Sequence, residues 1–484
     1  MIIVSVTGPT MNDACRQIRT SRRWADMFEL RLDLIRDLEL FPLLRRTGRP
    51  RIVTLRPVWE GGGFEGSEES RAAMLREIAA RGVEFIDVEL KAGRAIVEEI
   101  RRVSRSVRII VSLHGDAVPR SARESLHMFR GCGGDVVKWA YPAADSPDLR
   151  LAYDFLRMAK RGKQKAIAVA MGEAGEPSRI LYRVFGGWAT YAAPEGGPGA
   201  APGQLPASTL VDIYRSSSLN GRTKIFGLLG NPVAQSKGMY LHNAAFRKKG
   251  VNAVYVRFRT TDLETFARDI MPLIDGCSVT TPFKERVATL ARREDPGVRS
   301  SGAANTLYRV GKAWRAANSD SAAALDAIER ECLVRGKTLL IIGAGGAARA
   351  IAYEGTKRGA RVVLANRSAE RAAAAARDLH LRSVALAEIA DVPYDILANA
   401  TPVGMFPQVD DTPVPWELLR PGTVVFDAIY NPRETRLLRE AKRAGARVVS
   451  GAEMFILQAA RQQELFLHRK ADLGVLRRTM NKYL

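Results

Sequence analysis

Residues 108–142 read RIIVSLHGDAVPRSARESLHMFRGCGGDVVKWAYP and hold two apolar runs on either side of a more polar segment. The first run, Arg108–Leu113, leads into His114, and the second, Asp135–Trp139, contains Lys138. Apolar runs of this kind are typical of strands buried on both faces of a parallel sheet, in which the chain returns through a helix. The stretch therefore predicts a strand–helix–strand unit with a histidine and a lysine on neighbouring strands.

The same pattern extends from the N-terminus to about residue 215. Eight apolar runs, each followed by a plausible helix, predict a closed (β/α)8 barrel at the small end of the size range of that fold. The turn-rich stretch Pro194–Pro206 is expected to be a loop near the end of the barrel. The eight runs are Ile2–Val6, Met27–Leu32, Arg51–Leu55, Phe85–Leu90, Arg108–Leu113, Asp135–Trp139, Lys165–Ala170 and Gly187–Tyr191.

Composition restricts the class of protein. The 484 residues, 46% hydrophobic and 26% charged, are typical of a globular protein with two or three domains. We find no signal peptide, no apolar run long enough to span a membrane, and no metal or disulfide spacing among the four cysteines, which together predict a cytoplasmic protein without a metal. The net charge of +22 comes from arginines spread over almost every expected helix, which argues against a nucleic-acid partner and suits anionic substrates.

A short polar linker at 215–222 ends the barrel, and the α/β pattern then restarts. We expect a barrel domain over 1–218, a substrate-binding α/β domain over 223–325 completed by helices within 454–484, and a Rossmann-like dinucleotide domain over 326–453. The sequence does not predict an oligomeric state.

Charged groups at the ends of the barrel strands are the candidate catalytic residues, because barrel enzymes place their reactive groups there. Lys138 lies inside an apolar strand, where desolvation and neighbouring cations favour the neutral amine that can form a Schiff base with a ketone. The alternative is a lysine stem lying along the sheet with its head in solvent. His114 on the next strand could act as acid and base, and Glu60 could hold its ring in the useful tautomer.

The order ELRLD, TLRPVWEGG, VSLHG, VVKWAYP, AMGEAGEPSR and APGQ resembles type I 3-dehydroquinate dehydratases over residues 1–215. The resemblance implies an imine between Lys138 and dehydroquinate, proton transfer by His114, and support of His114 by Glu60. It departs from the family at Ala200, where a serine is usual, which predicts weaker substrate binding. The resemblance also implies that the substrate is bound by Glu29, Arg31, Arg56, Arg179 and Gln204. Of these, Arg179 would hold the substrate carboxylate.

The C-terminal half carries a dinucleotide signature. GAGGAA at 343–348 follows the apolar run Thr338–Ile342 and opens a helical stretch, an arrangement that places a pyrophosphate at a helix N-terminus. The next run ends in Asn366-Arg367-Ser368, where an NAD enzyme usually has an acid, so we expect NADP. Lys284 and Asp320 could share proton transfer, although spacing alone does not show that they meet.

Residues 224–484 resemble shikimate dehydrogenases in nine motifs, some of which include the residues just described. The motifs are GLLGNPVAQS, SVTTPFK, GAANTL, NSD, GAGGAARA, NRS, NATPVGM, FDAIYNP and SGAEMFILQAA. The family implies Lys284 and Asp320 as the catalytic pair. Two departures, Gly238 and Ser278 where serine and asparagine are usual, predict weaker or broader shikimate recognition that could admit quinate. The residues implied to bind substrate are Ser236, Thr280, Asn305, Tyr430 and Gln458, and those implied to hold NADP are Gly343, Gly345, Gly346, Ala347, Asn366, Arg367, Ser368, Thr401, Met405 and Gly451.

The order of the two halves resembles the plant bifunctional dehydratase–dehydrogenases. We therefore expect a shikimate-pathway enzyme that dehydrates 3-dehydroquinate and then reduces 3-dehydroshikimate with NADPH. Three alternatives stay open: a quinate/shikimate dehydrogenase of broadened specificity in the second half, a Schiff-base aldolase fused to another NADP dehydrogenase, and a non-catalytic regulator built from these domains.

Overall fold

The computed structural model describes residues 1–292 and 295–483. The chain divides into two compact units, one formed by Met1–Ile225 with Asn252–Leu273 and the other by Phe226–Val251 with Ile274–Leu484. Within the described residues, no helix has both the length and the apolar character that a membrane span requires.

The first unit contains a parallel eight-stranded sheet in the order β7-β6-β5-β4-β3-β2-β1-β8. The backbone N–H of Trp188, just before β8, donates to the carbonyl of Ala166 in β7 over 2.8 Å and brings the two edges together. This arrangement confirms the barrel predicted from the apolar runs. The strands are β1 (Ile2–Val6), β2 (Met27–Arg31), β3 (Arg51–Thr54), β4 (Phe85–Glu89), β5 (Arg108–His114), β6 (Val136–Pro142), β7 (Lys165–Met171) and β8 (Thr190–Ala192).

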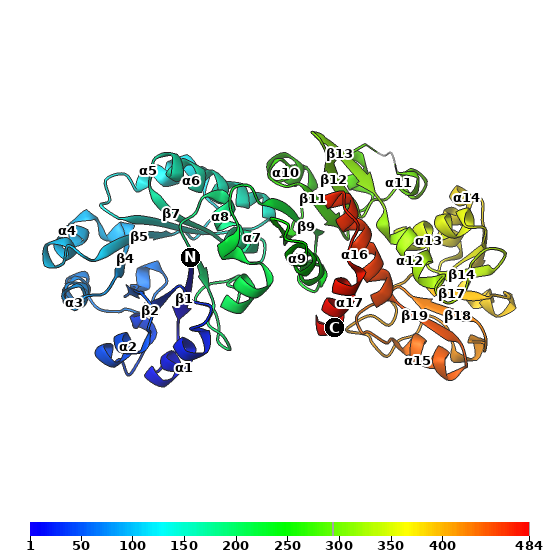
Figure 1. Ribbon diagram of the computed structural model, residues 1–484, viewed down its shortest axis with the longest axis horizontal. Coiled ribbons are helices and arrows are strands. Elements are labelled where there is room, and N and C mark those ends of the chain that lie inside the picture. The colour runs from blue at the N-terminus through cyan, green and yellow to red at the C-terminus, as the bar shows by residue number, and fades with distance from the viewer. Residues whose placement is uncertain (293–294, 484) are drawn as a thin grey trace. The chain divides into compact units, whose positions relative to one another are not determined.

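Helices follow the strands, as Figure 1 shows around β1–β7. The helix between β5 and β6, predicted from the opening stretch of sequence, is only 7 residues long. After β8 there are two short helical segments, Thr209–Ile213 and Ser216–Ser218, in place of a full helix. The helices are α1 (Met11–Ser21), α2 (Leu40–Arg46), α3 (Glu68–Ala80), α4 (Arg94–Val103), α5 (Ala122–Met128), α6 (Leu149–Arg161), α7 (Glu176–Ile180) and α8 (Tyr182–Phe185).

The barrel interior is built in layers. One layer is apolar and includes Ile3, Ile52 and Ile110. Side chains two residues further along a strand point to the same face, and at those positions β1 to β6 carry polar groups. The second layer therefore consists of buried Ser5, Glu29, Thr54, Asp87, Ser112 and Lys138. An apolar floor with a polar layer toward the carboxyl ends of the strands positions chemistry at one mouth of the barrel.

Residues 252–273 form β10 (Ala253–Arg259) and α10 (Leu263–Asp269) and group with the first unit. The Arg257 guanidinium donates to both carboxylate oxygens of Glu176 on α7, over 3.1 and 2.6 Å. Both side chains are largely buried, so α7 is held in place by a shielded ion pair.

Two sheets form the remainder of the fold. A five-stranded mixed sheet has the order β10-β9-β11-β12-β13, with β9 (Lys224–Gly230), β11 (Gly276–Val279), β12 (Thr306–Val310) and β13 (Ala313–Ala317). A parallel six-stranded sheet has the order β16-β15-β14-β17-β18-β19, the doubly wound order of dinucleotide-binding folds. Its strands are β14 (Thr338–Ile342), β15 (Arg361–Asn366), β16 (Arg382–Ala385), β17 (Ile396–Asn399), β18 (Val424–Asp427) and β19 (Arg447–Ser450).

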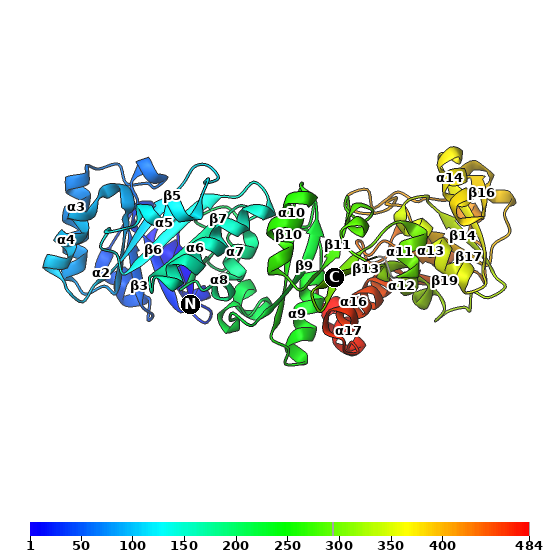
Figure 2. The same ribbon diagram turned by 90° about the horizontal axis from the view of Figure 1, so that it is seen from above.

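The last two helices, α16 (Gly451–Leu467) and α17 (Leu473–Tyr483), pack on α9 (Gly238–Lys248). Leu241 and Ala245 of α9 form one apolar cluster with Ile456, Leu476 and Met480. Figure 2 shows the same helices from above. The other helices of this half are α11 (Pro296–Ser301), α12 (Ser319–Ile328), α13 (Gly346–Lys357), α14 (Ala369–Leu379) and α15 (Arg436–Arg443).

Two candidate active sites

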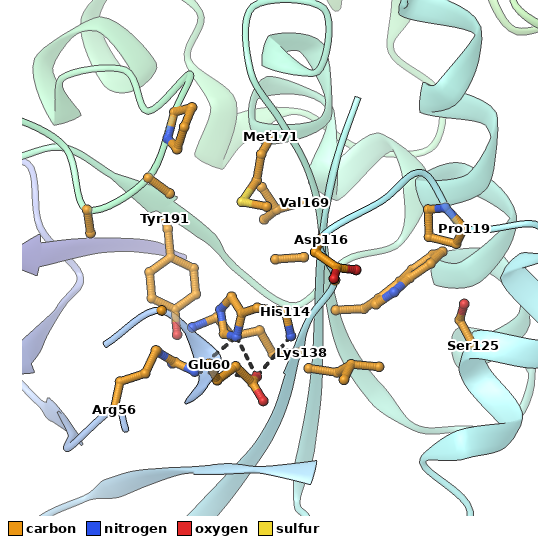
Figure 3. A pocket seen from close by; sticks show the side chains of 18 of the residues that line it. Arg56, Glu60, His114, Asp116, Pro119, Ser125, Lys138, Val169, Met171 and Tyr191 are labelled. Carbon is orange, nitrogen blue, oxygen red and sulfur yellow. Dashed lines mark hydrogen bonds and ion pairs between the residues drawn. The ribbon is translucent and has the colours of Figure 1, made fainter. Parts of the chain in front are cut away.

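A cavity of about 740 Å³ opens at the carboxyl ends of the barrel strands. Figure 3 shows Arg56, Glu60, His114, Lys138 and Tyr191 gathered in one part of this cavity. The structure therefore brings together side chains that the sequence placed on separate strands. Every barrel residue proposed from the sequence lines the cavity: Glu29, Arg31, Arg56, Glu60, His114, Lys138, Arg179 and Gln204.

Lys138 points into the barrel and is 5% exposed. Its Nζ lies 3.2 Å from Asp87 Oδ2, 3.5 Å from Glu29 Oε1 and 4.3 Å from the centre of the Tyr191 ring. The nearest charged neighbours are thus carboxylates, whereas the sequence argument had expected cations. The two carboxylates fix the position of Nζ at the mouth of the barrel.

His114 ends the neighbouring strand. Its Nδ1 lies 2.9 Å from Glu60 Oε1, and the same oxygen accepts the backbone N–H of His114 over 2.9 Å. Arg56 Nη1 is also 2.9 Å from Nδ1. Nδ1 can donate to Glu60 or accept from Arg56, but not both at once. When its N–H donates to Glu60, the ring is fixed and Nε2 carries the lone pair that exchanges protons with a ligand.

Burial and the nearby cations Arg56 and Lys138 hold the pKa of His114 well below its usual range. Burial also raises the pKa of Glu60 to about 7, although Arg56 opposes the shift. The imidazole is therefore neutral and able to accept a proton at neutral pH. The carboxyl beside it changes charge in the same pH range.

Asp87 is a functional residue that the sequence reasoning missed. It is fully buried on β4, and its Oδ1 accepts from Ser112 Oγ over 2.6 Å and from Arg56 Nη2 over 3.1 Å. Burial alone would raise the pKa of Asp87, but Lys138 and Arg56 outweigh it and hold the pKa below its usual range. The sequence does contain a signal for Asp87: it lies two residues beyond the inward-facing Phe85, just as Lys138 lies two residues beyond the inward-facing Val136 on β6.

The other proposed substrate residues differ in how far their side chains are already engaged. Arg179 is 1% exposed and donates to the carbonyl of Pro202 over 3.1 Å, and its buried Nε has no hydrogen-bond partner among the described residues. Burial lowers its pKa to about 10. Arg31 instead makes a two-pronged contact with Asp33, and Gln204 Oε1 accepts the backbone N–H of Ala200 over 2.7 Å. Arg179 is therefore the cation best able to receive a ligand carboxylate.

In the second half, Lys284 Nζ and Asp320 Oδ2 lie 2.6 Å apart. Lys284 follows β11, and Asp320 lies in the first turn of α12, whose N-cap Asn318 accepts the Asp320 N–H. The segment before β12 joins the two elements: Ala304 donates its N–H to the Lys284 carbonyl over 2.7 Å, and Asn318 donates to the Ala303 carbonyl over 3.1 Å. The contact that the sequence could not establish is therefore present.

A polar network lies beside this pair. Asn305 donates to Ser319 Oγ over 2.9 Å and to Gln458 Oε1 of α16 over 3.3 Å. The Ser278 hydroxyl donates to Gln462 Oε1 over 2.7 Å, which turns it to α16. The remaining proposed substrate residues are Ser236, Thr280 and Tyr430. Within the described part of the chain, no hydrogen bond or ion pair links them to Lys284 or Asp320. Ser236 accepts from the Gly238 N–H, and Tyr430 stacks on Phe455.

The glycine-rich turn after β14 fits a dinucleotide. Gly343 has φ +125°, and a Cβ there would lie 3.2 Å from the Ala400 carbonyl, so the backbone requires glycine. At Gly345, by contrast, a Cβ would meet no atom within 4 Å, and Gly345 caps α13 without a side-chain hydrogen bond. In the part of the chain that the structure describes, no hydrogen bond engages the first backbone N–H groups of α13, with Ala347 in its first turn, and the space at Gly345 is open, as pyrophosphate binding requires.

The end of β15 bears on the identity of the nucleotide. Arg367 is exposed, Asn366 donates to the Ser368 carbonyl, and Ser368 caps α14. The nearest acid is Glu370, 3.4 Å from the Ser368 hydroxyl. A cation directly after the strand, with the acid displaced into the helix, fits a 2′-phosphate better than a bare ribose.

Three further residues proposed for the cofactor lie in the turns after β17 and β19. The Thr401 hydroxyl donates to Asn399 Oδ1 over 2.7 Å, and Met405 is 44% exposed. A Cβ at Gly451 would lie 2.4 Å from the Ile429 carbonyl, so packing alone explains this glycine.

The chain matches the family model of type I 3-dehydroquinase over residues 2–220 and that of the shikimate dehydrogenase substrate binding domain over 228–307. It is 34% identical to the chloroplastic bifunctional 3-dehydroquinate dehydratase/shikimate dehydrogenase of Arabidopsis thaliana, covering 99% of this chain and 84% of that one. It is 37% identical to the NADP(+) shikimate dehydrogenase of Pyrococcus furiosus, over 55% of this chain and 98% of the relative.

Among solved structures, shikimate 5-dehydrogenase from Thermus thermophilus in complex with NADP(H) and shikimate matches 54% of this chain and 100% of its own, with 31% identity and a TM-score of 0.50. The dehydrogenase relatives thus cover one half of the chain, whereas the plant relative covers both. The chain belongs to the family of bifunctional 3-dehydroquinate dehydratase/shikimate dehydrogenases.

Proposed function

We propose that this chain is a lyase and an oxidoreductase in one. The barrel, residues 1–218, dehydrates 3-dehydroquinate to 3-dehydroshikimate through a Schiff base. The second half, a substrate-binding domain over 223–325 completed by 454–484 and an NADP domain over 326–453, reduces that product to shikimate. One observation carries the proposal: Lys138 lies inside the barrel mouth, one strand from a histidine held by a buried glutamate.

In the first reaction, the amine of Lys138 attacks the substrate ketone and water leaves as the imine forms. Asp87 and Glu29, already in contact with Nζ, hold it in place, and the protons that the nitrogen gives up leave on the carbonyl oxygen as that water. His114 then removes a proton from the carbon next to the imine and returns one to the departing hydroxyl, which leaves as water. Hydrolysis of the imine releases the product and restores the amine.

The residues around this pair orient the substrate. Arg179 supplies a buried cation with an unused donor, which suits the substrate carboxylate. Glu60, once ionised, stabilises the positive charge that His114 acquires. Arg56 joins the His114 side of the site to Asp87, so the acid–base group and the nucleophile are set by one network.

For the second reaction, NADPH held at the glycine-rich turn after β14 would supply the hydride that a carbonyl carbon needs. Lys284 donates a hydrogen bond and then a proton to the carbonyl oxygen, and Asp320 holds the Lys284 ammonium in position. Ser236, Thr280, Asn305, Tyr430 and Gln458 would bind the substrate. Gly343, Gly345, Gly346 and Ala347 would hold the pyrophosphate, Asn366, Arg367 and Ser368 the 2′-phosphate, and Thr401, Met405 and Gly451 would lie nearby.

The test is a two-step conversion by the purified full chain. Dehydroquinate with NADPH should yield shikimate, and dehydroquinate alone should stop at dehydroshikimate. Formation of an aldol product from a simple aldehyde, without dehydration, would favour the Schiff-base aldolase instead. Absence of turnover in both halves would favour the non-catalytic regulator, although all four proton-transfer groups, Lys138, His114, Lys284 and Asp320, are in place.

A second candidate for the dehydrogenase half is a quinate/shikimate dehydrogenase. Gly238 offers no side chain at the start of α9, and the Ser278 hydroxyl is taken up by Gln462. Both departures remove hydrogen-bond donors from the expected substrate site and leave room for a bulkier group. Steady-state kinetics on both acids decide, and quinate turnover below roughly a thousandth of shikimate turnover removes this candidate.

For the cellular setting we propose a cytoplasmic enzyme acting on small anionic molecules, without a nucleic-acid or membrane partner. The four cysteines are unpaired thiols, in keeping with a reducing compartment. Fractionation of cells into soluble, membrane and organelle pools tests this location.

A further inference from the structure

A second hollow in the first unit lies between α5 and α6, and arginine dominates its lining. Its volume is about 560 Å³. The charged side chains that line it are Arg120, Arg123, Arg150, Asp154, Arg157 and Arg161. Five guanidinium groups therefore share one concave surface with one carboxylate, a net charge of 5 − 1 = +4.

The helix geometry concentrates these charges. Arg150, Arg157 and Arg161 recur along one face of α6, and Arg157 and Arg161 are four residues apart, a spacing at which like charges repel. Arg123 projects from α5, which packs beside α6 (Figure 1). The fold thus assembles cations whose mutual repulsion a bound anion would relieve.

The partners of these arginines inside the protein are few. Arg150 contacts Asp154 over 2.9 Å, and Arg157 donates a hydrogen bond to the Tyr153 hydroxyl. Both Arg150 and Arg157 also lie over the Tyr153 ring, at 5.7 and 5.2 Å from its centre. Across residues 1–292 and 295–483, neither a hydrogen bond nor an ion pair engages the side chain of Arg120, Arg123 or Arg161.

Arginines elsewhere in the same unit behave differently. On α4, Arg94 pairs with Glu98 over 2.7 Å and Arg101 with Asp135 over 3.0 Å. Arg51 and Arg71 likewise each contact a glutamate. The arginines at these positions thus have acidic partners, whereas in the α5–α6 hollow one carboxylate, Asp154, which pairs with Arg150, faces five arginines.

We propose that this hollow is a binding site for a small polyanion that carries phosphate groups. Planar guanidinium groups match phosphate oxygens with paired hydrogen bonds, and several converging forks favour a ligand with more than one phosphate. The volume falls within the range of small-molecule sites. The hollow is distinct from the proposed sites for the organic acids of both reactions, which are carboxylates without phosphate.

The test is isothermal titration of the full chain with inorganic pyrophosphate at physiological ionic strength, with NADP present to fill the dinucleotide site. Arg123→Glu/Arg161→Glu removes two unpaired arginines from the hollow. Arg120 stays intact because it also lines the barrel cavity. Arg102→Glu/Arg105→Glu is the matched control, since both of these arginines are exposed and the change in net charge is the same.

We expect one saturable site in the wild type and in the control pair, weakened at least about tenfold in Arg123→Glu/Arg161→Glu. Circular dichroism and dehydratase turnover show that each variant is folded. Absence of saturable binding in the wild type overturns the proposal. Equal weakening of pyrophosphate binding in both variants also overturns the proposal, because diffuse positive charge would then explain the binding. Binding of a long nucleic acid without any binding of pyrophosphate overturns it as well.

Discussion

The two candidate active sites are built in opposite ways. In the barrel, the reacting groups lie on the inner faces or ends of strands, and Glu29, Arg56, Asp87 and Lys138 are each at most 5% exposed. In the dehydrogenase half, Lys284 lies in a turn after a strand, and its side chain is 32% exposed. The barrel site is therefore a buried network in which each charge depends on its neighbours, whereas the second site rests on one accessible ion pair.

This difference predicts that the barrel site is the more sensitive to substitution. Removing one member of a buried charge network leaves its partners unpaired at a cost of about 3–5 kcal/mol. Removing one member of a partly exposed pair leaves its partner to water, which costs far less.

The largest effect is expected for Lys138→Met. Dehydration should fall by at least about 10⁴-fold, because no other group can form the imine. Oxidation of shikimate with NADP should stay within about twofold of wild type, since Lys284 and Asp320 are untouched. Lys91→Met, at an exposed position that also lines the cavity, is the matched control. A dehydration rate in Lys138→Met above about a hundredth of the wild-type rate would show that the nucleophile is misassigned. That rate is about a hundredfold higher than the rate we expect.

The converse substitution, Lys284→Met, should lower shikimate turnover by about 10³-fold with little change in KM, because it removes the proton donor. Dehydratase activity should be unchanged. Lys337→Met, which removes another exposed lysine paired with an aspartate, is the control. A fall in dehydration in Lys284→Met would mean that the two sites are not separate.

Glu60→Gln should lower the dehydration rate by about 50-fold and alter its dependence on pH. Burial raises the pKa of Glu60 to about 7, so this carboxyl carries a proton below that pH and cannot stabilise a charged imidazole. The wild-type rate should therefore rise with pH through about 7, and Glu60→Gln should lose this step. An unchanged step in the variant would assign the titration to another group.

The smallest effect is expected for Arg367→Ala. It should raise KM for NADPH about tenfold and leave KM for NADH almost unchanged, because NADH lacks the 2′-phosphate. An equal effect on both nucleotides would contradict the assignment. Arg382→Ala, an exposed arginine at the start of β16, controls for the change in charge.

Much of this comparison could be predicted from the sequence, because hydrophobic runs and turn residues carry local information. All eight barrel strands overlap the apolar runs, although β8 shares only Thr190 and Tyr191 with its run. Lys138 and His114 could be assigned to adjacent strands because sequential parallel strands in a barrel are neighbours. The pairing of Lys284 with Asp320 could only be expected by resemblance, since it depends on how a turn and a helix start meet.

What the sequence concealed are contacts between distant segments. The carboxylates around Lys138 come from β2 and β4, and a search for apolar runs passed over Asp87 because it lies within one. The two-pronged pairing of Arg31 with Asp33 and the engagement of Ser278 by Gln462 depend on side-chain direction, which composition does not specify. For the arginine hollow between α5 and α6, the sequence predicts only a general positive surface charge, because its arginines are spread over 42 positions from Arg120 to Arg161.

The most direct test of the account is to trap the imine. The full chain is incubated with dehydroquinate, reduced with borohydride and digested, and the peptides are analysed by mass spectrometry. We predict a stable adduct on the peptide that contains Lys138, absent from Lys138→Arg and from samples without substrate. An adduct on Lys91, or dehydration that proceeds with no adduct at all, would contradict the proposal that Lys138 forms the Schiff base.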